Sequence, residues 1–192
     1  MQATPAFPDV DAVVIGTSAG GVDALLCLLP ALPASFRRAV LVVIHLPPDP
    51  ATGLVTVLAD RCVLPVSEAL DKQPVQPGEI VVAPPNYHLL VEPSRTLALS
   101  VDPPVCFSRP AIDPLFESAA IAWGPRLLAL LLTGGSEDGS EGLAAVRARG
   151  GQAWVQDPST AVARTMPAAG LQRAGADAVL TLPEMAERLA RG

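Results

Sequence analysis

The feature that most constrains this chain is the alternation of short, continuous apolar runs with helix-length amphipathic stretches. Runs that are apolar at every position, rather than at every second one, are typical of strands buried on both faces of a parallel sheet. We therefore predict an α/β fold, a three-layer α/β/α sandwich with a mostly parallel, doubly wound sheet. The predicted strands are residues 11–16, 39–44, 127–132, 153–155 and 178–182, and the predicted helices are 21–29, 52–60, 140–149, a segment beginning near Pro167, and 183–189.

The middle third of the chain departs from this pattern. Its short strand-like runs are separated by Pro, Asn and Gly, and they lie at 80–82, 89–91 and 97–101. This spacing favours a small antiparallel hairpin excursion inserted into the parallel fold. No repeat and no long linker divides the chain, so we expect a short N-terminal tail at 1–10 and a single domain at 11–192.

Composition narrows the classes of partner and compartment. Half of the 192 residues are hydrophobic, and the formal net charge is −6. An acidic chain lacks the basic face that nucleic acids and anionic membranes attract, so we expect neither as a partner. Cys27, Cys62 and Cys106 are too far apart for a typical zinc site and odd in number for a disulfide framework. Without a signal-peptide pattern or an apolar run that could cross a bilayer, we expect a cytoplasmic protein with no membrane insertion.

A glycine-rich turn, G-T-S-A-G-G at residues 16–21, joins the first predicted strand to the first predicted helix. A serine between glycines at this point is typical of a nucleophile turn, where amides at the helix start can face an oxyanion. A phosphate-binding turn is the alternative. Against it, Ser18 occupies a position that the dinucleotide pattern G-x-G-x-x-G gives to glycine, and no lysine follows as in a P-loop. The turn by itself leaves both interpretations open.

Two more reactive residues follow predicted strands. His45, one of only two histidines, comes directly after 39–44, and Asp138 lies in the loop after 127–132. Each residue has an ordinary alternative role: His45 as a loop or core histidine, and Asp138 as the cap of a helix. Because the carboxyl ends of parallel strands meet at one edge of a sheet, we predict that Ser18, His45 and Asp138 converge there. They would act as a nucleophile, a base and an orienting carboxylate.

The order of these residues excludes the α/β-hydrolase family, in which the chain order is Ser, Asp, His. The acidic residues Glu137, Asp138 and Glu141 also disfavour a phosphate ligand, because they would repel it. The second histidine, His88, lies in the predicted antiparallel excursion, and we interpret it as a rim or packing residue.

Six segments, in order, resemble the chemotaxis protein-glutamate methylesterase family, CheB, in its catalytic domain, from about residue 13 to residue 189. The turn at 16–21 resembles the family's G-x-S-[TA]-G-G, I-H-L-P-P at 44–48 its histidine segment, and L-T-G-G-S-E-D-G at 132–139 its L-T-G-M-G-x-D-G loop. The other matching segments are A-P-P-N-Y-H at 83–88, S-R-P-A-I-D at 108–113, and Gln156-Asp157 with Met166-Pro167.

The resemblance implies a serine esterase that hydrolyses glutamate γ-methyl esters on methyl-accepting chemoreceptors and also deamidates glutamine, without a metal or cofactor. Ser18 is then the nucleophile, His45 its base and Asp138 the residue that orients the imidazole. The implied oxyanion and substrate-binding residues are Thr17, Ala19, Gly135 and Arg109. The implied partners are the cytoplasmic helices of the chemoreceptors and a separate regulatory protein acting in trans.

Three departures from the family pattern bear on function. Gly135 replaces the methionine whose backbone amide is associated with the oxyanion site. Residues 105–108 lack the polar and basic residues common before Arg109, so receptor recognition is expected to differ. The residues before Asp11 are too few for the family's receiver domain, so we expect the catalytic domain to stand alone.

Two other functions are open on the sequence. A non-catalytic CheB-like binding module would keep the fold and dock on receptors or signalling proteins, and Gly135 favours it. A nucleotide- or phosphosugar-binding α/β protein would use the two glycine-rich loops. Ordinary roles are also open for two single residues: Asp113 is predicted to cap a helix, and Arg109 either pairs with receptor carboxylates or is a surface arginine.

Overall fold

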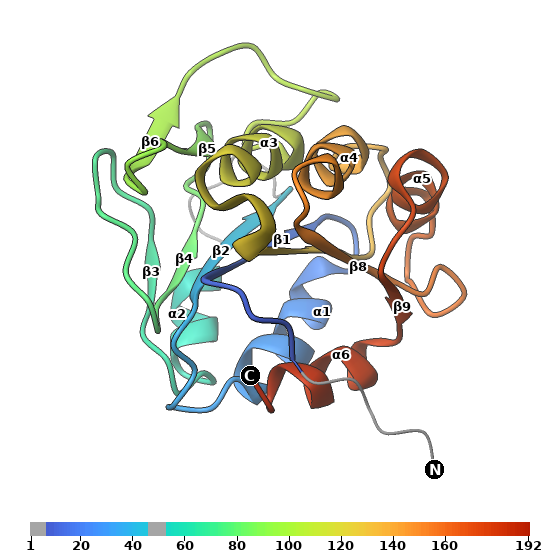
Figure 1. Ribbon diagram of the computed structural model, residues 1–192, viewed down its shortest axis with the longest axis horizontal. Coiled ribbons are helices and arrows are strands. Elements are labelled where there is room, and N and C mark those ends of the chain that lie inside the picture. Colours follow the sequence, from blue (N-terminus) through green and yellow to red (C-terminus); the bar gives the residue numbers. More distant parts are fainter. Residues whose placement is uncertain (1–6, 46–52) are drawn as a thin grey trace.

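A seven-stranded sheet forms the centre of the computed structural model, which describes residues 7–45 and 53–192 (Figure 1). The strands are β1 (Ala12–Thr17), β2 (Ala39–Ile44), β3 (Val66–Glu68), β4 (Ile80–Val82), β7 (Leu127–Leu131), β8 (Gln152–Gln156) and β9 (Ala178–Leu180). Their order is β3-β4-β2-β1-β7-β8-β9, and every neighbouring pair is parallel.

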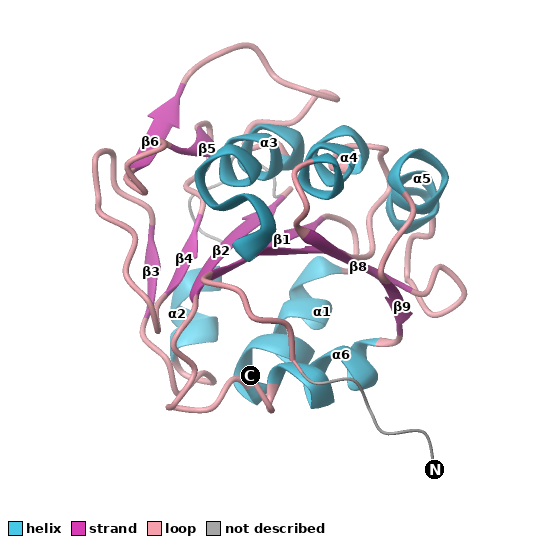
Figure 2. Cartoon of the chain, viewed as in Figure 1, coloured by secondary structure: helices cyan, strands magenta, loops and turns pink. Residues whose placement is uncertain are grey.

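Helices cover both faces of this sheet (Figure 2). One face carries α3 (Ile112–Trp123), α4 (Ser140–Ala148) and α5 (Thr165–Ala174), and the other carries α1 (Gly21–Leu28), α2 (Leu54–Ala59) and α6 (Leu182–Leu189). Short 3-10 segments follow α1 and α3, at Leu29–Ala31 and Gly124–Arg126. Each layer of helices packs on its own apolar core. The predicted three-layer α/β/α sandwich is confirmed.

The central strands are apolar at every position because both of their faces are buried. All six residues of β1 and all six of β2 are buried. Along β1, Val14 belongs to the core beneath α3 and α4, whereas Val13 and Ile15 belong to the core on the α1 side. Successive side chains of a strand point to opposite faces, so a strand covered on both sides needs apolar residues throughout.

The middle third of the chain differs from its prediction in one respect. Residues 80–82, expected in the antiparallel excursion, form β4, which pairs in parallel with β2 and β3 inside the main sheet. All three residues are buried, so this run behaves like the other continuous apolar runs despite the turn residues around it. The antiparallel hairpin itself is confirmed, and it consists of β5 (His88–Val91) and β6 (Leu97–Ser100).

Other element boundaries also differ from the sequence prediction. Neither the edge strand β3 nor the helix α3 is predicted from the sequence, and both are present. Helix α2 begins at Leu54, and Thr52, the predicted first residue of this helix, lies outside the described residues. None of the helices in the described part of the chain has the length and hydropathy of a membrane span.

The sheet changes its direction of growth between β1 and β7. Helix α1 follows β1 on one face of the sheet, whereas α4 follows β7 on the other face (Figure 2). The loops after these neighbouring strands therefore lead to helices on opposite faces of the sheet, and ligands of open α/β sheets commonly bind at such a switch point. The loops after β1, β2 and β7, which carry the three candidate reactive residues, lie around this point.

Helices α3 and α4 approach each other closely at Gly142. A Cβ atom at this position would lie 2.6 Å from the Cβ of Phe116 and 3.1 Å from the backbone of Asp113. We predict that Gly142→Ala lowers the free energy of unfolding by about 1–3 kcal/mol, because the two helices must separate to admit the methyl group. Urea denaturation measures this change.

Gly135→Ala is the matched control for that variant. A Cβ atom on Gly135 would meet nothing within 4 Å, so the free energy of unfolding should stay at the wild-type value. Equal destabilisation of the two variants would contradict the close approach of the helices.

Candidate active site

Ser18 and His45 are next to each other at the ends of neighbouring strands. Strands β1 and β2 pair in register up to Thr17 and Ile44, and the backbone N–H of His45 donates to the carbonyl of Thr17 at 3.1 Å. Ser18 and His45 are therefore the first residues beyond the paired strands. The Ser18 hydroxyl has no hydrogen-bond partner within residues 7–45 and 53–192, so its contact with His45 is not formed in this structure.

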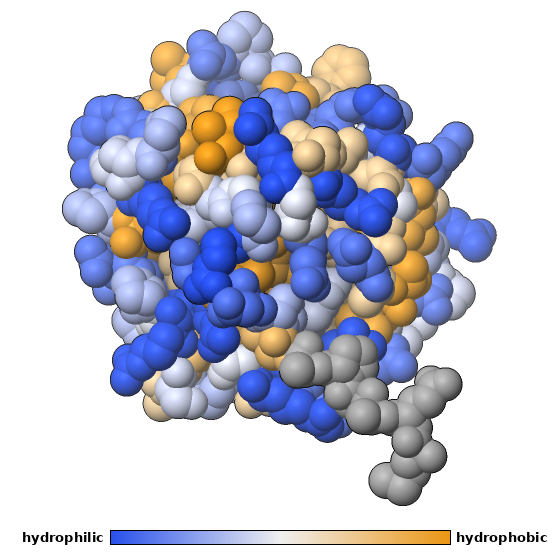
Figure 3. Space-filling view, viewed as in Figure 1, coloured by the Kyte–Doolittle hydropathy of each residue, from blue (hydrophilic) through white to orange (hydrophobic). Residues whose placement is uncertain are grey.

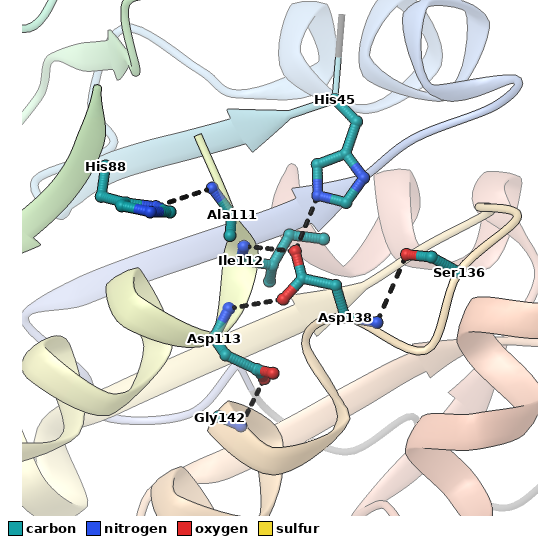
Figure 4. Close-up of polar contacts among 8 residues, drawn as sticks. All are labelled: His45, His88, Ala111, Ile112, Asp113, Ser136, Asp138 and Gly142. Carbon is teal, nitrogen blue, oxygen red and sulfur yellow. Dashed lines mark hydrogen bonds and ion pairs between the residues drawn. The ribbon is translucent and has the colours of Figure 1, made fainter. Parts of the chain in front are cut away.

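The imidazole of His45 contacts the carboxylate of Asp138. Its Nε2 lies 2.7 Å from Oδ2 of Asp138, and the two side chains are 11% and 0% exposed (Figure 4). A carboxylate oxygen only accepts, so Nε2 carries the proton of this bond. The other ring nitrogen, Nδ1, is left to act on a different group. The structure thus brings two of the three predicted residues into direct contact.

The Asp138 carboxylate also binds the first turn of α3. Its Oδ2 accepts from the backbone N–H of Ile112 at 2.7 Å, and its Oδ1 accepts from that of Asp113 at 3.0 Å (Figure 4). The first amides of a helix have no partner within the helix, and the positive end of the helix dipole favours an anion there. Asp138 therefore does cap a helix, but this helix is α3 and not α4, which follows it in the chain.

The turn around Ser18 requires glycine for steric reasons. Gly20 has a φ of 79°, and a Cβ atom on Gly21 would lie 2.6 Å from the Thr17 side chain. The N–H of Gly21 donates to the carbonyl of Ser18 at 2.8 Å, which closes the turn. The N–H of Ser18 itself donates to the carbonyl of Thr133 at 2.9 Å. Ser18 is thus fixed by its backbone at the point where β1 ends.

Thr133 joins the nucleophile turn to the loop after β7, a role that no local sequence pattern indicates. Its carbonyl accepts from both Ser18 N–H and the hydroxyl of Thr17, each at 2.9 Å, and its own hydroxyl donates to the carbonyl of Ala19 at 2.8 Å. The buried amide of Gln156 accepts from the Thr133 N–H at 2.9 Å. Thr17, predicted to bind substrate, is itself fully buried, and its side chain holds the turn.

The backbone amides of Ala19 and Gly135 are candidates for binding an oxyanion. Within the described residues, the N–H groups of Ala19 and Gly135 donate no hydrogen bond. The residue before Gly135 is fixed on both sides, since Gly134 N–H donates to Ala163 at 3.0 Å and its carbonyl accepts from Met166 N–H at 2.9 Å. Beyond Gly135, the Ser136 hydroxyl accepts from the Asp138 N–H at 3.3 Å. These two amides are available to bind an oxyanion.

A pocket of about 230 Å³ opens beside the imidazole of His45. Arg109 lies in its wall, and Nη1 of the guanidinium donates to the carbonyls of Val101 and Asp102 at 2.9 and 3.1 Å. Its Nε atom is buried without a partner among the described residues. Arg109 thus lies in the wall of the pocket that His45 lines, and it also braces the loop between β6 and α3. The lining residues are His45, Asn86, Pro104, Phe107, Ser108, Arg109 and Pro110.

His88 has a structural role, which confirms its interpretation as a packing residue. The side chain is buried, and Nδ1 accepts from Ala111 N–H at 3.2 Å (Figure 4). Nε2 donates to the carbonyl of Pro103 at 3.1 Å. Both ring nitrogens are thereby occupied. His88 joins the hairpin to the residue that precedes α3 and to the loop that bears Arg109.

Asp113 caps a helix, as predicted, but this helix is α4 and not its own helix α3. The N-cap of α3 is Ala111, and the Asp113 carboxylate instead accepts from the N–H of Gly142, in the first turn of α4, at 2.7 Å (Figure 4). Burial, together with the nearby negative charges of Asp138 and Glu117, raises the pKa of Asp113 to about 7. Helix α3 is thus capped by Asp138, from the loop before α4. Helix α4 is capped by Asp113, from the first turn of α3.

Nothing in the described part of the chain resembles a metal centre. No three His, Cys, Asp or Glu side chains among residues 7–45 and 53–192 lie together in an arrangement that could hold a metal ion. The three cysteines are free thiols. Burial raises the pKa of the Cys106 thiol, and the acidic groups of Asp138, Asp113 and Glu137 raise it further.

Comparison with known proteins gives one consistent result. The family model described as CheB methylesterase matches residues 13–189. A protein of Leptospira interrogans is 39% identical over 181 residues, which are 94% of each chain, and its name assigns it provisionally as a protein-glutamate methylesterase/protein-glutamine glutaminase. A protein of Symbiobacterium thermophilum with that name is 39% identical, but the match covers 93% of this chain and 49% of the relative.

A solved structure has the same fold. The crystal structure of the Thermotoga maritima CheB methylesterase catalytic domain superposes with a TM-score of 0.89 at 32% sequence identity. The superposition covers 94% of this chain and 97% of the other.

The buried carboxyl of Asp113 should make stability depend on pH. Its pKa is about 7 in the folded protein against 3.8 for an ordinary aspartate, so the folded state binds more protons than the unfolded chain between these values. The free energy of unfolding should therefore fall as pH rises from about 4 to about 7 and then level off. Asp113→Asn, which cannot titrate, should flatten this fall by on the order of 1–2 kcal/mol.

Urea denaturation of wild type and Asp113→Asn at pH 5 and pH 8 measures the difference. Asp60→Asn, a change of an exposed aspartate on the opposite helical layer, is the control and should keep the wild-type pH dependence. The same pH dependence in Asp113→Asn and wild type would contradict the prediction.

Proposed function

The chain belongs to the CheB methylesterase family, and on that premise we propose that it is a protein-glutamate methylesterase. It hydrolyses glutamate γ-methyl esters of methyl-accepting chemoreceptors to glutamate and methanol, by means of a Ser18–His45–Asp138 triad. The observation that carries this proposal is the position of His45, which is bonded to the buried carboxylate of Asp138 and lies beside Ser18 at the end of the neighbouring strand.

The contacts of His45 decide which of its nitrogens acts as the base. Nε2 donates its proton to Asp138, so Nδ1 takes the proton from Ser18 as the hydroxyl attacks the ester carbonyl. This step requires a rotation of the Ser18 side chain toward His45, as is common for catalytic hydrogen bonds that tighten only with substrate bound. Asp138 then stabilises the imidazolium that forms.

Backbone amides complete the reaction site. The N–H groups of Ala19 and Gly135, which have no acceptor among the described residues, bind the oxyanion of the tetrahedral intermediate. His45 returns the proton to the leaving methoxide, and methanol departs. A water molecule, deprotonated by His45, then hydrolyses the acyl-enzyme and restores Ser18 and a glutamate carboxylate. With ammonia as the leaving group, the same steps deamidate glutamine.

The pocket beside His45 receives the substrate. Arg109 lies in its wall, and the substrate-side face of the guanidinium can pair with receptor carboxylates that flank the ester. Thr17 acts indirectly. Its hydroxyl donates to the carbonyl of Thr133, and this hydrogen bond holds the nucleophile turn in place. The proposed catalytic unit is residues 11–192, which acts on the cytoplasmic helices of the receptors. A cytoplasmic location and regulation by a separate protein stay predictions.

The rival functions have less support. A phosphate-binding protein would place its anion beside Asp138 and Asp113, in a region where burial and like charges already raise the pKa of a carboxyl. A non-catalytic binding module has no need for a buried carboxylate bonded to a histidine beside a serine. The family membership of the chain supports the hydrolase over both.

Ser18→Ala tests the proposal directly. We predict that it lowers the rate of methanol release from methylated receptor by about 10⁴-fold or more, because the nucleophile is lost. The free energy of unfolding should not change, since the Ser18 hydroxyl has no partner within the described residues. Labelling of wild type by a fluorophosphonate probe, and its loss in the variant, gives a second measurement.

Ser136→Ala is the matched control for that variant. The Ser136 hydroxyl contacts only the backbone N–H of Asp138 within the described residues, so its loss should reduce the rate less than about tenfold. Unchanged methanol release by Ser18→Ala would refute the proposed chemistry.

Gly135→Met restores the residue that the family pattern has at this position. A side chain here restricts the backbone that carries the oxyanion amide, and the position is sterically open. We predict a kcat about two- to fivefold above wild type, with unchanged stability. Single-turnover kinetics with a methylated receptor fragment measures the change, and a kcat at or below the wild-type value would contradict it.

A further inference from the structure

Two exposed aromatic side chains lie on loops that meet at the pocket beside His45. The chain has four Phe, two Trp and one Tyr, and among the described residues only Tyr87 and Phe107 are exposed, Phe107 fully and Tyr87 by 41%. The N–H of Asn86 donates to the carbonyl of Arg109 at 3.2 Å and so joins the two loops. Large exposed apolar groups gathered at one place are typical of a binding surface.

The backbone of residues 105–108 holds Phe107 outward in a sterically unfavourable turn. Val105 and Ser108 exchange N–H···O bonds of 3.1 and 2.9 Å, and the residues between them, Cys106 and Phe107, have φ angles of 47° and 64°. Two-residue turns of this kind require positive φ and strongly prefer Asn-Gly, since a side chain is unfavourable there. In this strained conformation the Phe107 side chain lies in solvent and is not buried by any other described part of the protein. Such strain is typical of functional positions.

The loop that carries Phe107 is braced at several points. Arg109 donates to the carbonyls of Val101 and Asp102, and His88 donates to that of Pro103. In Figure 1 this loop, between β6 and α3, stands away from the body of the protein above the sheet. Figure 3 shows apolar groups among the hydrophilic ones at the same end of the molecule. The turn is thus held in place before any partner binds, which lowers the entropic cost of binding.

We propose that Phe107 docks an apolar side chain of the receptor helix that presents the methylated glutamate. This inference rests on the proposed function. A helix whose ester reaches Ser18 and His45 must cross the rim of the same pocket, which Phe107 lines. On a helix, residues three or four positions from the ester lie on the same face, about 5–6 Å away. One of these residues packs against Phe107.

The chemistry of the loop favours an apolar contact over an ionic one. Residues 103–108 carry no charged side chain, and the protein as a whole is acidic. The turn before Arg109 consists of Val105, Cys106, Phe107 and Ser108. An aromatic anchor on this turn therefore selects the receptor segment in addition to the pairing that Arg109 offers to its carboxylates.

Phe107→Ser tests the inference with two substrates. For a methylated receptor cytoplasmic fragment we expect KM to rise at least about tenfold, with kcat within twofold of wild type. For p-nitrophenyl acetate, which is too small to reach the rim, kcat/KM should stay within twofold. Phe107→Leu should give an intermediate KM, and Val63→Ser, at an exposed apolar position elsewhere, should leave all values unchanged.

The outcomes separate this inference from the function on which it rests. An unchanged receptor KM in Phe107→Ser, with normal methanol release, would overturn the docking role and leave the esterase intact. An equal loss on p-nitrophenyl acetate would overturn it as well, since Phe107 would then maintain the fold of the site. If wild type hydrolyses p-nitrophenyl acetate but releases no methanol from the receptor, the proposed function fails, and the inference fails with it.

Discussion

Two buried carboxylates, exchanged between helices α3 and α4, hold the site together. Asp138, just before α4, binds the first amides of α3, and Asp113, in the first turn of α3, binds the amide of Gly142 in α4. The amides at the start of each helix have no acceptor within their own helix, and they find one on the segment of the other helix. Loss of either carboxylate would leave buried amides without partners, at a cost of about 1–3 kcal/mol each. The position of Asp138, and through it that of His45, therefore depends on the packing of α3 against α4.

This arrangement links helix packing to chemistry. The close contact of Gly142 with Phe116 lets the two helix starts approach, and the Asp138 carboxylate sits where three donors converge, two amides and the imidazole. A carboxylate held in this way cannot rotate freely, so the imidazole it binds is fixed in orientation before substrate arrives. Burial of the Asp113 carboxyl, together with the nearby charge of Asp138, raises the pKa of Asp113. Asp138 binds the imidazole of His45, and Asp113 holds its proton more tightly than an ordinary aspartate does.

The sequence predicts the parts of the site that depend on strand ends, and it misses the parts that depend on packing between distant segments. Ser18, His45 and Asp138 follow continuous apolar runs, and parallel strands bring such positions to one edge. The three-residue strand β4 is too short for its periodicity to be read among neighbouring turn residues. The roles of Thr133 and Asp113 arise from contacts across the fold, with Ser18 and with Gly142, that no local pattern encodes. The helix cap expected at Asp138 exists, but on a different helix.

The proposed chemistry and the proposed recognition occupy different parts of this protein. The candidate reactive groups lie at the ends of central strands whose own residues are all buried, so that a change in one core is transmitted to its neighbours. The loop around Phe107 leaves from the antiparallel hairpin, outside the sheet. The side chains of Arg109, His88 and Ser100 bond its backbone. A substitution of the fully exposed Phe107 side chain therefore alters the rim of the pocket and leaves the hydrogen bonds of Asp138 and of the nucleophile turn in place. A fold organised in this way can change the segment it recognises while it keeps the reaction it catalyses.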